Sequence, residues 1–302
     1  MIAALRAELA RTNFAGREVS LAEGALVVAG TCALARRTGR SLDLLALAGI
    51  GGLGLLDDLL EPHQRRAGRP VSKGLRGHLA SLRSGRVTTG AAKALGIPAL
   101  ALLAAAGGPA PRGGAMVPVD AALTAGCANL ANLLDLRHGR ALKAVLPPAA
   151  LLALTAGQDE RARSGARLAV AALLPGALAL PADLRERGML GDAGANVLGA
   201  AVGAAAARTL PAPARLALLG GVVALTLASE KVSFSAVIDR TPALRALDRA
   251  GRLPVPAPAE DDPSGAESGS AGPEATDGPA GSEGPAEAPE PPTAQGDAEE
   301  AR

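Results

Sequence analysis

Apolar and polar residues alternate along this chain in long blocks. Stretches rich in Ala, Leu, Val and Gly are separated by shorter segments that carry most of the charges. Such blocks predict helices that cross a membrane, since a span needs roughly 20 mostly apolar residues. The predicted fold class is therefore all-α, a polytopic helical bundle in a membrane. Eight helices are expected, at residues 22–35, 42–57, 92–107, 116–134, 144–156, 164–181, 193–208 and 214–229. Pro147-Pro148 should kink the fifth helix or delay its start.

The composition supports a membrane location. The chain has 302 residues, of which 48% are hydrophobic and 38 are glycine, with no Trp, no Tyr and two Phe. Glycine and alanine let helices approach closely within a bilayer, although the usual interfacial aromatic residues are missing. Cys32 and Cys127 fall within predicted spans, have no metal-ligand spacing and are expected to be small buried residues. No cleavable signal peptide is expected, because the first twenty residues lack a clean apolar core.

The last fifty residues differ from the rest of the chain. Residues 254–302 contain twelve acids, ten prolines and one basic residue, without apolar periodicity. This composition predicts a disordered tail, so we expect a membrane domain at 1–252 and a tail at 253–302, which could bind a protein partner. Without the tail, 17 acids face 30 bases. A basic membrane domain suits an anionic substrate or anionic membrane lipids rather than nucleic acid.

Basic residues are unevenly distributed between the loops. The N-terminus and the segments 58–93, 135–143, 182–192 and 230–252 hold 21 Lys and Arg, whereas the opposite loops hold nine. Because positive loops stay in the cytoplasm, both termini are expected there, in a multi-pass protein of the inner (plasma) membrane.

Two adjacent carboxylates, Asp57 and Asp58, are expected where the second apolar stretch meets a basic loop. They repel each other, and the helix dipole disfavours negative charge at the C-terminal end of the predicted helix. A compensating positive charge is therefore expected, and a divalent metal with a phosphorylated substrate is the first candidate. Mg²⁺ binds one or two carboxylates together with phosphate oxygens.

Other polar residues are predicted on the same cytoplasmic face. Carboxylates from several helix ends that meet a basic surface can hold Mg²⁺ against a diphosphate. These residues are Asn132 and Asp135 at the end of the fourth span, Asp192 at the start of the seventh, and Lys73, Arg76 and Lys93 in the long basic loop.

Five segments, in order, resemble the polyprenyl-phosphate N-acetylhexosamine-1-phosphate transferases, the family of phospho-N-acetylmuramoyl-pentapeptide transferase and its N-acetylglucosamine-1-phosphate relatives. The resemblance covers residues 13–250. Its segments are NFAGREVSLAEG (13–24), GLLDDLLEP (54–62), KGLRGHLASLRSGRVTTGAAK (73–93), NLLDLRHG (132–139) and MLGDAGANVLG (189–199).

The resemblance implies an activity and roles for matching residues. These enzymes use Mg²⁺ to transfer a sugar-1-phosphate from a UDP-sugar to a polyprenyl phosphate, such as the undecaprenyl or decaprenyl form, in cell-envelope polysaccharide or peptidoglycan precursor synthesis. A homodimer is a further expectation. The implied roles are catalysis for Asp57, Asp58 and Asp135, substrate binding for Lys73, Asn132 and Asp192, and metal binding for Asp135 and Asp192.

The sequence also departs from the family pattern. In NLLDLRHG, Leu136 replaces a glycine and His138 replaces an aspartate of the family motif, and residues 233–252 lack the family's histidine-rich motif. The family also places a span before the NFAGR-like loop, where this sequence has only MIAALRAELART. The missing histidines favour an alternative, a non-catalytic membrane protein of the same fold with a structural or partner-binding role. A transporter is a third interpretation, disfavoured because the polar residues gather at one face rather than at mid-span.

Each candidate residue also has a simpler structural interpretation. The Asp57-Asp58 pair could bind Arg65 or Arg66, and Asp135 could bind Arg137 or Arg140. Asp192 could cap a helix, and Asn132 could bond between helices. Lys73 could be an ordinary positive-inside charge. His138 is interpreted as a bystander rather than a replacement ligand.

Overall fold

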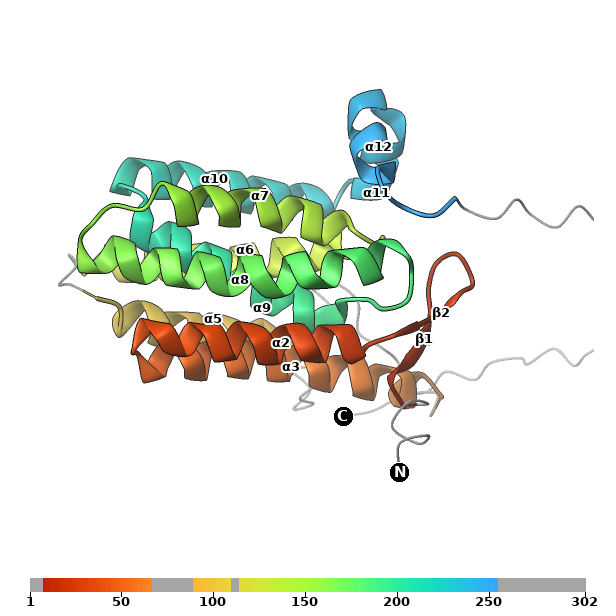
Figure 1. The fold of residues 1–302 in the computed structure, drawn as a ribbon, viewed down its shortest axis with the longest axis horizontal. Coiled ribbons are helices and arrows are strands. Elements are labelled where there is room, and N and C mark those ends of the chain that lie inside the picture. The colour runs from red at the N-terminus through yellow and green to blue at the C-terminus, as the bar shows by residue number, and fades with distance from the viewer. Residues whose placement is uncertain (1–7, 67–88, 110–113, 255–302) are drawn as a thin grey trace, which may run out of the picture. The chain divides into compact units, whose positions relative to one another are not determined.

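A computed structural model describes residues 8–66, 89–109 and 114–254 of the chain (Figure 1). These residues are mostly helical, with ten α-helices and 78% of residues in helices, which confirms the predicted helical character. Four of the helices are long and apolar enough to cross a membrane, consistent with a membrane protein. They are α5 (Thr89–Ala106), α6 (Met116–Leu134), α8 (Glu160–Leu184) and α10 (Ala212–Ser229).

A helix occupies each of the eight positions expected from the sequence, and two further short helices follow. The helical elements not yet given are α2 (Ala22–Ala35), a 3-10 turn η1 (Arg36–Thr38), α3 (Ser41–Arg66), α7 (Arg140–Leu154), α9 (Gly191–Thr209), α11 (Phe234–Arg240) and α12 (Pro242–Arg249). The compact unit that contains all of them runs from Met1 to Pro256.

Several of the expected helix ends differ from those in the structure, among them those of α3 and α7. The second helix, α3, continues to Arg66, so Asp57 and Asp58 lie within it and the argument from a C-terminal dipole does not hold. The fifth helix, α7, begins at Arg140, and Pro147-Pro148 lie inside it without delaying its start. Burial of α7 against α8 outweighs the backbone hydrogen bonds that the two prolines cannot donate.

The centre of the bundle is α9, which is buried along nearly its whole length. It packs against α6, α8, α3 and α2 (Figure 1). Its small residues make this possible: a Cβ at Gly199 would lie 2.8 Å from the Ala128 Cα, and one at Gly203 would lie 2.8 Å from the Thr124 Cα. Close approach through small residues is the usual way in which helices associate in membranes.

A short β-hairpin, not expected from the sequence, precedes the bundle. Strand β1 (Ala10–Thr12) pairs antiparallel with β2 (Glu18–Ser20). The turn is built by Asn13, whose Oδ1 accepts hydrogen bonds from the backbone N–H groups of Ala15 and Arg17, both at 2.9 Å. Ser20 also forms a parallel bridge with Gly188, which fixes the hairpin beside the start of α9. Within the described residues the fold is therefore helical with one small exception.

The two cysteines only partly match expectation. Cys32 and Cys127 are free, and each is partly rather than fully buried. Both pack against the apolar core.

Candidate functional site

Three helices bring one charged side chain each to a common point at one end of the bundle. Asp57 comes from α3, Lys93 from near the start of α5 and Asp192 from the first turn of α9. The Lys93 Nζ donates to the Asp57 Oδ2 at 2.8 Å and also contacts the Asp192 Oδ2. The structure therefore brings Asp57 and Asp192 together, as predicted, and identifies Lys93 as the positive charge between them.

Asp58 has a different role from its neighbour: its carboxylate caps the N-terminus of α9. Its Oδ1 accepts the Asp192 backbone N–H and its Oδ2 the Ala193 N–H, both at 3.0 Å. Gly191 makes this cap possible, because it has a φ of 58° and because a Cβ there would lie 2.8 Å from the Asp58 Oδ2. Asp192 is therefore not the cap of its own helix, and its side chain is free to face Lys93.

The backbone of Asp58 links the site to the hairpin. Asp58 itself is half-buried and follows the apolar stretch of α3. The Asp58 carbonyl oxygen also accepts a 2.7 Å hydrogen bond from the Arg11 guanidinium, which ties the hairpin to the site.

Asp135 lies half-buried just after α6 and belongs to the same electrostatic environment. Burial raises its pKa well above the ordinary value, and the negative charges of Asp183, Asp192, Asp58 and Glu23 add to this effect. Like charges gathered away from water favour protonation or the binding of a cation.

Neither arginine proposed as a partner of Asp135 binds it. Arg140 is paired with Asp248 at 2.7 Å, and Arg137 lies over the ring of Phe14, 4.1 Å from its centroid.

Asn132 is not part of this contact network among the described residues. Asn132 supplies only its backbone oxygen, which accepts the Asp135 N–H at 3.1 Å, and its side chain makes no interhelical hydrogen bond within the described residues. Lys73 and Arg76 lie outside the described residues, as does the tail beyond residue 254. The side chains of Arg65 and Arg66 are likewise not described.

Sequence reasoning missed Glu23, an acidic residue in the first turn of α2. Both of its carboxylate oxygens are buried and lack a hydrogen-bond partner among the described residues. The carboxylate lies against Gly188, where a Cβ would collide with it. The available signal was an acid at the start of an apolar helix. Acids are common at helix N-termini for structural reasons, so this signal alone did not indicate a site.

His138 is held in structural contacts. Its side chain is buried, its Nδ1 lies 2.7 Å from the Asp183 Oδ1, and its Nε2 lies 3.1 Å from the Asn13 Nδ2. Asn13 also donates to Glu186 at 2.6 Å. Asp183 accepts the Gly139 N–H with its other oxygen. His138 therefore joins the hairpin to the ends of α7 and α8, beside the acidic site.

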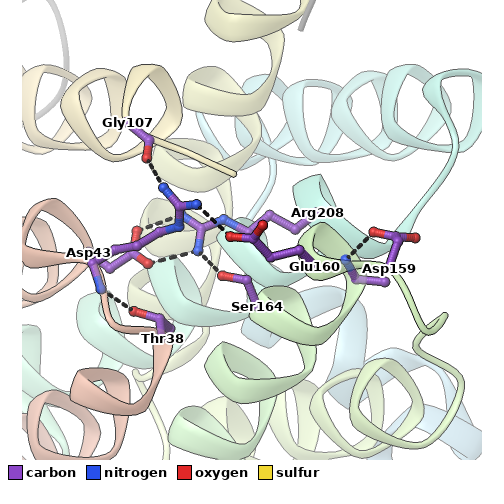
Figure 2. Close-up of polar contacts among 9 residues, drawn as sticks. Thr38, Asp43, Gly107, Asp159, Glu160, Ser164 and Arg208 are labelled. Atoms are coloured by element: carbon purple, nitrogen blue, oxygen red, sulfur yellow. Dashed lines mark hydrogen bonds and ion pairs between the residues drawn. The ribbon is translucent and has the colours of Figure 1, made fainter. Parts of the chain in front are cut away.

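A second set of charges lies at the opposite end of the bundle. Figure 2 shows Arg208 of α9 between Asp43 of α3 and Ser164 of α8. The Arg208 Nη1 donates to the Asp43 Oδ2 at 2.8 Å and to the Ser164 Oγ at 2.9 Å, and Nη2 donates to the other Asp43 oxygen. Since these charges satisfy one another, we interpret the set as a structural clamp between three helices.

The acidic end is thus the candidate site. It combines four aspartates predicted from the sequence with Glu23 and one lysine. Among the described residues, no three Asp, Glu, His or Cys side chains are arranged as a ready-made metal site. The donors are nevertheless oxygens of the kind that Mg²⁺ prefers, and no ion pair to Asp135 or Glu23 is formed by the part of the chain that the structure describes.

No family model matches the sequence, no curated protein matches it, and no solved structure matches the fold.

Proposed function

We propose that this protein transfers a sugar-1-phosphate from a UDP-sugar to a polyprenyl phosphate at a membrane surface. The observation that carries the proposal is the convergence of Asp57, Asp58 and Asp192 around Lys93, with Asp135 in the same electrostatic environment. Phosphoryl transfer depends mainly on positioning and charge neutralisation. A group of carboxylates with one lysine at the end of a membrane bundle suits that chemistry.

In this proposal the residues have distinct roles. Asp135 and Asp192 would hold Mg²⁺, which supplies neutralisation of the diphosphate charge when bound. Lys93 would release one carboxylate and contact a phosphate oxygen instead. Asp58 keeps the start of α9 in place, while Asp57 lies where it can orient the lipid phosphate.

The reaction balances without a further reactant. A phosphate oxygen of the polyprenyl phosphate forms a bond to the sugar-linked phosphorus of the UDP-sugar, and the bond from that phosphorus to the bridging oxygen breaks. UMP leaves with this oxygen. The product is a polyprenyl diphosphate sugar.

The proposal includes a topology. All eight long helices would cross the inner (plasma) membrane, with the acidic end of the bundle and both termini in the cytoplasm. The four helices with sufficient length and apolar composition support this arrangement, as does the excess of basic residues in the loops at the acidic end.

A second candidate is a non-catalytic protein of the same fold. The observation that favours it is the pairing of Lys93 with Asp57 and Asp192, which already compensates two of the four aspartates without a metal. The bonds of His138 to Asp183 and Asn13 point the same way, since they engage this histidine in structural contacts.

The deciding experiment measures exchange of radiolabelled UMP into candidate UDP-sugars, in membranes supplied with undecaprenyl or decaprenyl phosphate, with and without Mg²⁺. Exchange that requires Mg²⁺ is expected. Asp135→Asn should lower it by about 10²–10³-fold, the usual loss when one group that stabilises transition-state charge is removed. Glu230→Gln, an exposed carboxylate after α10, is the matched control and should keep wild-type exchange. Absence of exchange with every UDP-sugar would favour the non-catalytic candidate, and full activity of Asp135→Asn would refute the metal assignment.

A further inference from the structure

The two short helices after α10 expose apolar side chains on one side. In α12, Leu244 and Leu247 are 42% and 61% exposed, and Val237 of α11 is 42% exposed. Leu244 and Leu247 are three residues apart and share one face of the helix. Arg245 and Arg249 are four residues apart and lie on a different face, so α12 has an apolar and a basic side.

Polar contacts hold this segment to the bundle. Asp248 is the only buried residue of α12, and its carboxylate binds Arg140 of α7 and Arg252, both at 2.7 Å. The Lys143 ammonium donates to the carbonyl oxygens of Leu247 and Asp248 at 3.1 and 2.7 Å. The apolar side of α12 has no comparable packing against the described residues and is left exposed.

The segment is located where a membrane surface is expected. Helix α10 is one of the four helices long and apolar enough to cross a membrane, and it ends at Ser229, only a few residues before Phe234. In Figure 1, α12 lies beyond the end of α10, runs across the direction of the bundle helices and projects past the edge of the bundle. A helix so placed lies roughly in the plane of the bilayer surface, beside the protein.

The charge of the segment indicates which surface it meets. The exposed cations of the two helices are Arg240, Arg245 and Arg249. Of its acids, Asp248 is already occupied by two arginines, and Asp239 is exposed. Short helices with leucines on one side and arginines on the other bind at the boundary between head groups and acyl chains, more strongly when the lipids are anionic.

We propose that α11 and α12 form an interfacial anchor that docks on anionic lipid head groups next to the acidic end of the bundle. A lipid surface fits better than a protein partner, because two short helices with three exposed apolar side chains offer far less area than a specific protein interface needs, roughly 800 Å² on each side. The anchor is independent of catalysis and would exist in either candidate of the preceding subsection.

The test places an environment-sensitive fluorophore on each side of α12 in the full chain. Cys32 and Cys127 are replaced by alanine, and single cysteines are introduced as Leu247→Cys on the apolar side or Arg249→Cys on the basic side. The labelled proteins are reconstituted into vesicles of phosphatidylcholine alone or mixed with phosphatidylglycerol. Brominated acyl chains report insertion, and aqueous iodide reports exposure to water.

With phosphatidylglycerol present, the label at 247 should be quenched by the brominated lipid and shielded from iodide, while the label at 249 stays accessible to iodide. Each arginine near an anionic surface changes partitioning by about fivefold. Arg240→Gln combined with Arg245→Gln should therefore lower the ratio of inserted to exposed label at 247 by about 25-fold. Both side chains are exposed, so the fold should be unaffected.

Two results would overturn the proposal. One is equal access of iodide to positions 247 and 249 in the mixed vesicles. The other is shielding of position 247 that does not change when phosphatidylglycerol is omitted or when the two arginines are replaced, which would assign the leucines to a contact other than an anionic lipid surface.

Discussion

At the scale of single residues, the acidic site depends on which positive charge faces the aspartates. Lys93 contacts both Asp57 and Asp192, so an ammonium stands where the adjacent carboxylates led us to expect a metal. Bonds between ionised partners are worth roughly twice as much as neutral ones. A cation that binds here must therefore displace Lys93 or bind beside it, at Asp135.

Replacing this lysine distinguishes the two possibilities. In Lys93→Met, Asp57 and Asp192 lose their counter-charge, so Mg²⁺ should raise the melting temperature more than it does in the wild type. UMP exchange should fall by about tenfold or more, because a hydrogen bond to a charged group contributes about 1.5–3 kcal/mol. Thermal unfolding in detergent with and without Mg²⁺ measures the first effect. Lys231→Met, at an exposed position after α10, is the control. An unchanged response to Mg²⁺ would show that the cation does not use these two carboxylates.

At the scale of elements, α9 organises the protein because its small side chains let other helices approach closely. Gly199 faces the backbone of α6, and Gly191 leaves room for the Asp58 carboxylate of α3, which caps α9. The site is therefore built at the place where the most buried helix begins, and its geometry depends on helix packing several turns away.

Enlarging α9 should loosen this packing. In Gly199→Ala, the new Cβ would collide with the backbone oxygen of Cys127 and lie 2.8 Å from the Ala128 Cα and the Ala131 Cβ. Overpacking of this kind costs about 1–3 kcal/mol, to be seen as a lower midpoint of thermal unfolding in detergent. Gly221→Ala in α10 is the matched control, because a Cβ at that position would meet no side chain or neighbouring helix of the described residues within 4 Å. If the two variants had the same unfolding midpoint, the close approach of α6 and α9 would not limit stability.

The attachment of α12 should respond to acid. Burial tends to raise the pKa of Asp248, but its hydrogen bond to Arg140 and the charges of Arg140, Arg252 and Lys143 outweigh burial and keep the pKa below its ordinary value. Because the pKa is lowered, the ionised Asp248 stabilises the attachment of α12 at pH values above the ordinary carboxyl pKa. This stabilisation is lost as the pH falls through the lowered pKa.

At pH values below the ordinary carboxyl pKa, hydrogen-exchange protection factors should therefore fall in α12 while α9 remains protected. In Asp248→Asn, protection of α12 should be low at all pH values. Asp239→Asn, an exposed acid on α11, should behave like the wild type. Acid sensitivity that survives in Asp248→Asn would place the titrating group elsewhere.

At the scale of the whole molecule, charges are divided between the two ends of the bundle. Among the described residues, one end gathers acids that are only partly compensated, and the other pairs its buried charges closely, as Asp43 is paired with Arg208 (Figure 2). Partly compensated and fully paired charges are thus separated along the bundle axis. The paired end fixes how α3, α8 and α9 lie relative to one another, and α3 and α9 both continue to the acidic end.

The clamp at the paired end should be costly to break on one side only. Asp43→Asn leaves a buried Arg208 without its counter-charge and should cost about 3–5 kcal/mol, whereas Asp43→Leu combined with Arg208→Met should cost less. Glu160→Gln, which breaks the exposed pair with Arg40 at 3.0 Å, should cost less than about 1 kcal/mol. Unfolding midpoints in detergent measure all three. A double variant as unstable as Asp43→Asn would mean that the apolar replacements, rather than the charges, limit stability.

The sequence by itself determined the helices. Blocks of Ala, Leu, Val and Gly predicted a helix at each of the eight positions, because apolar length and helix formation are local properties. It also singled out Asp57, Asp58, Asp135 and Asp192, since charges at the edges of apolar blocks stand out without a structure. Helix ends were less certain: α3 runs on through its two aspartates to Arg66 and α7 starts before its prolines, because packing outweighs local preference.

The tertiary structure decided what each of these charges does. Only the meeting of α3, α5 and α9 shows that Lys93 faces Asp57 and Asp192, that Asp58 caps a helix more than a hundred residues away, and that Glu23 belongs to the same end. The partners of His138 could not be predicted for the same reason, since they lie on other elements. Electrostatic interactions depend on distance in space, and a pattern along the chain contains no measure of that distance.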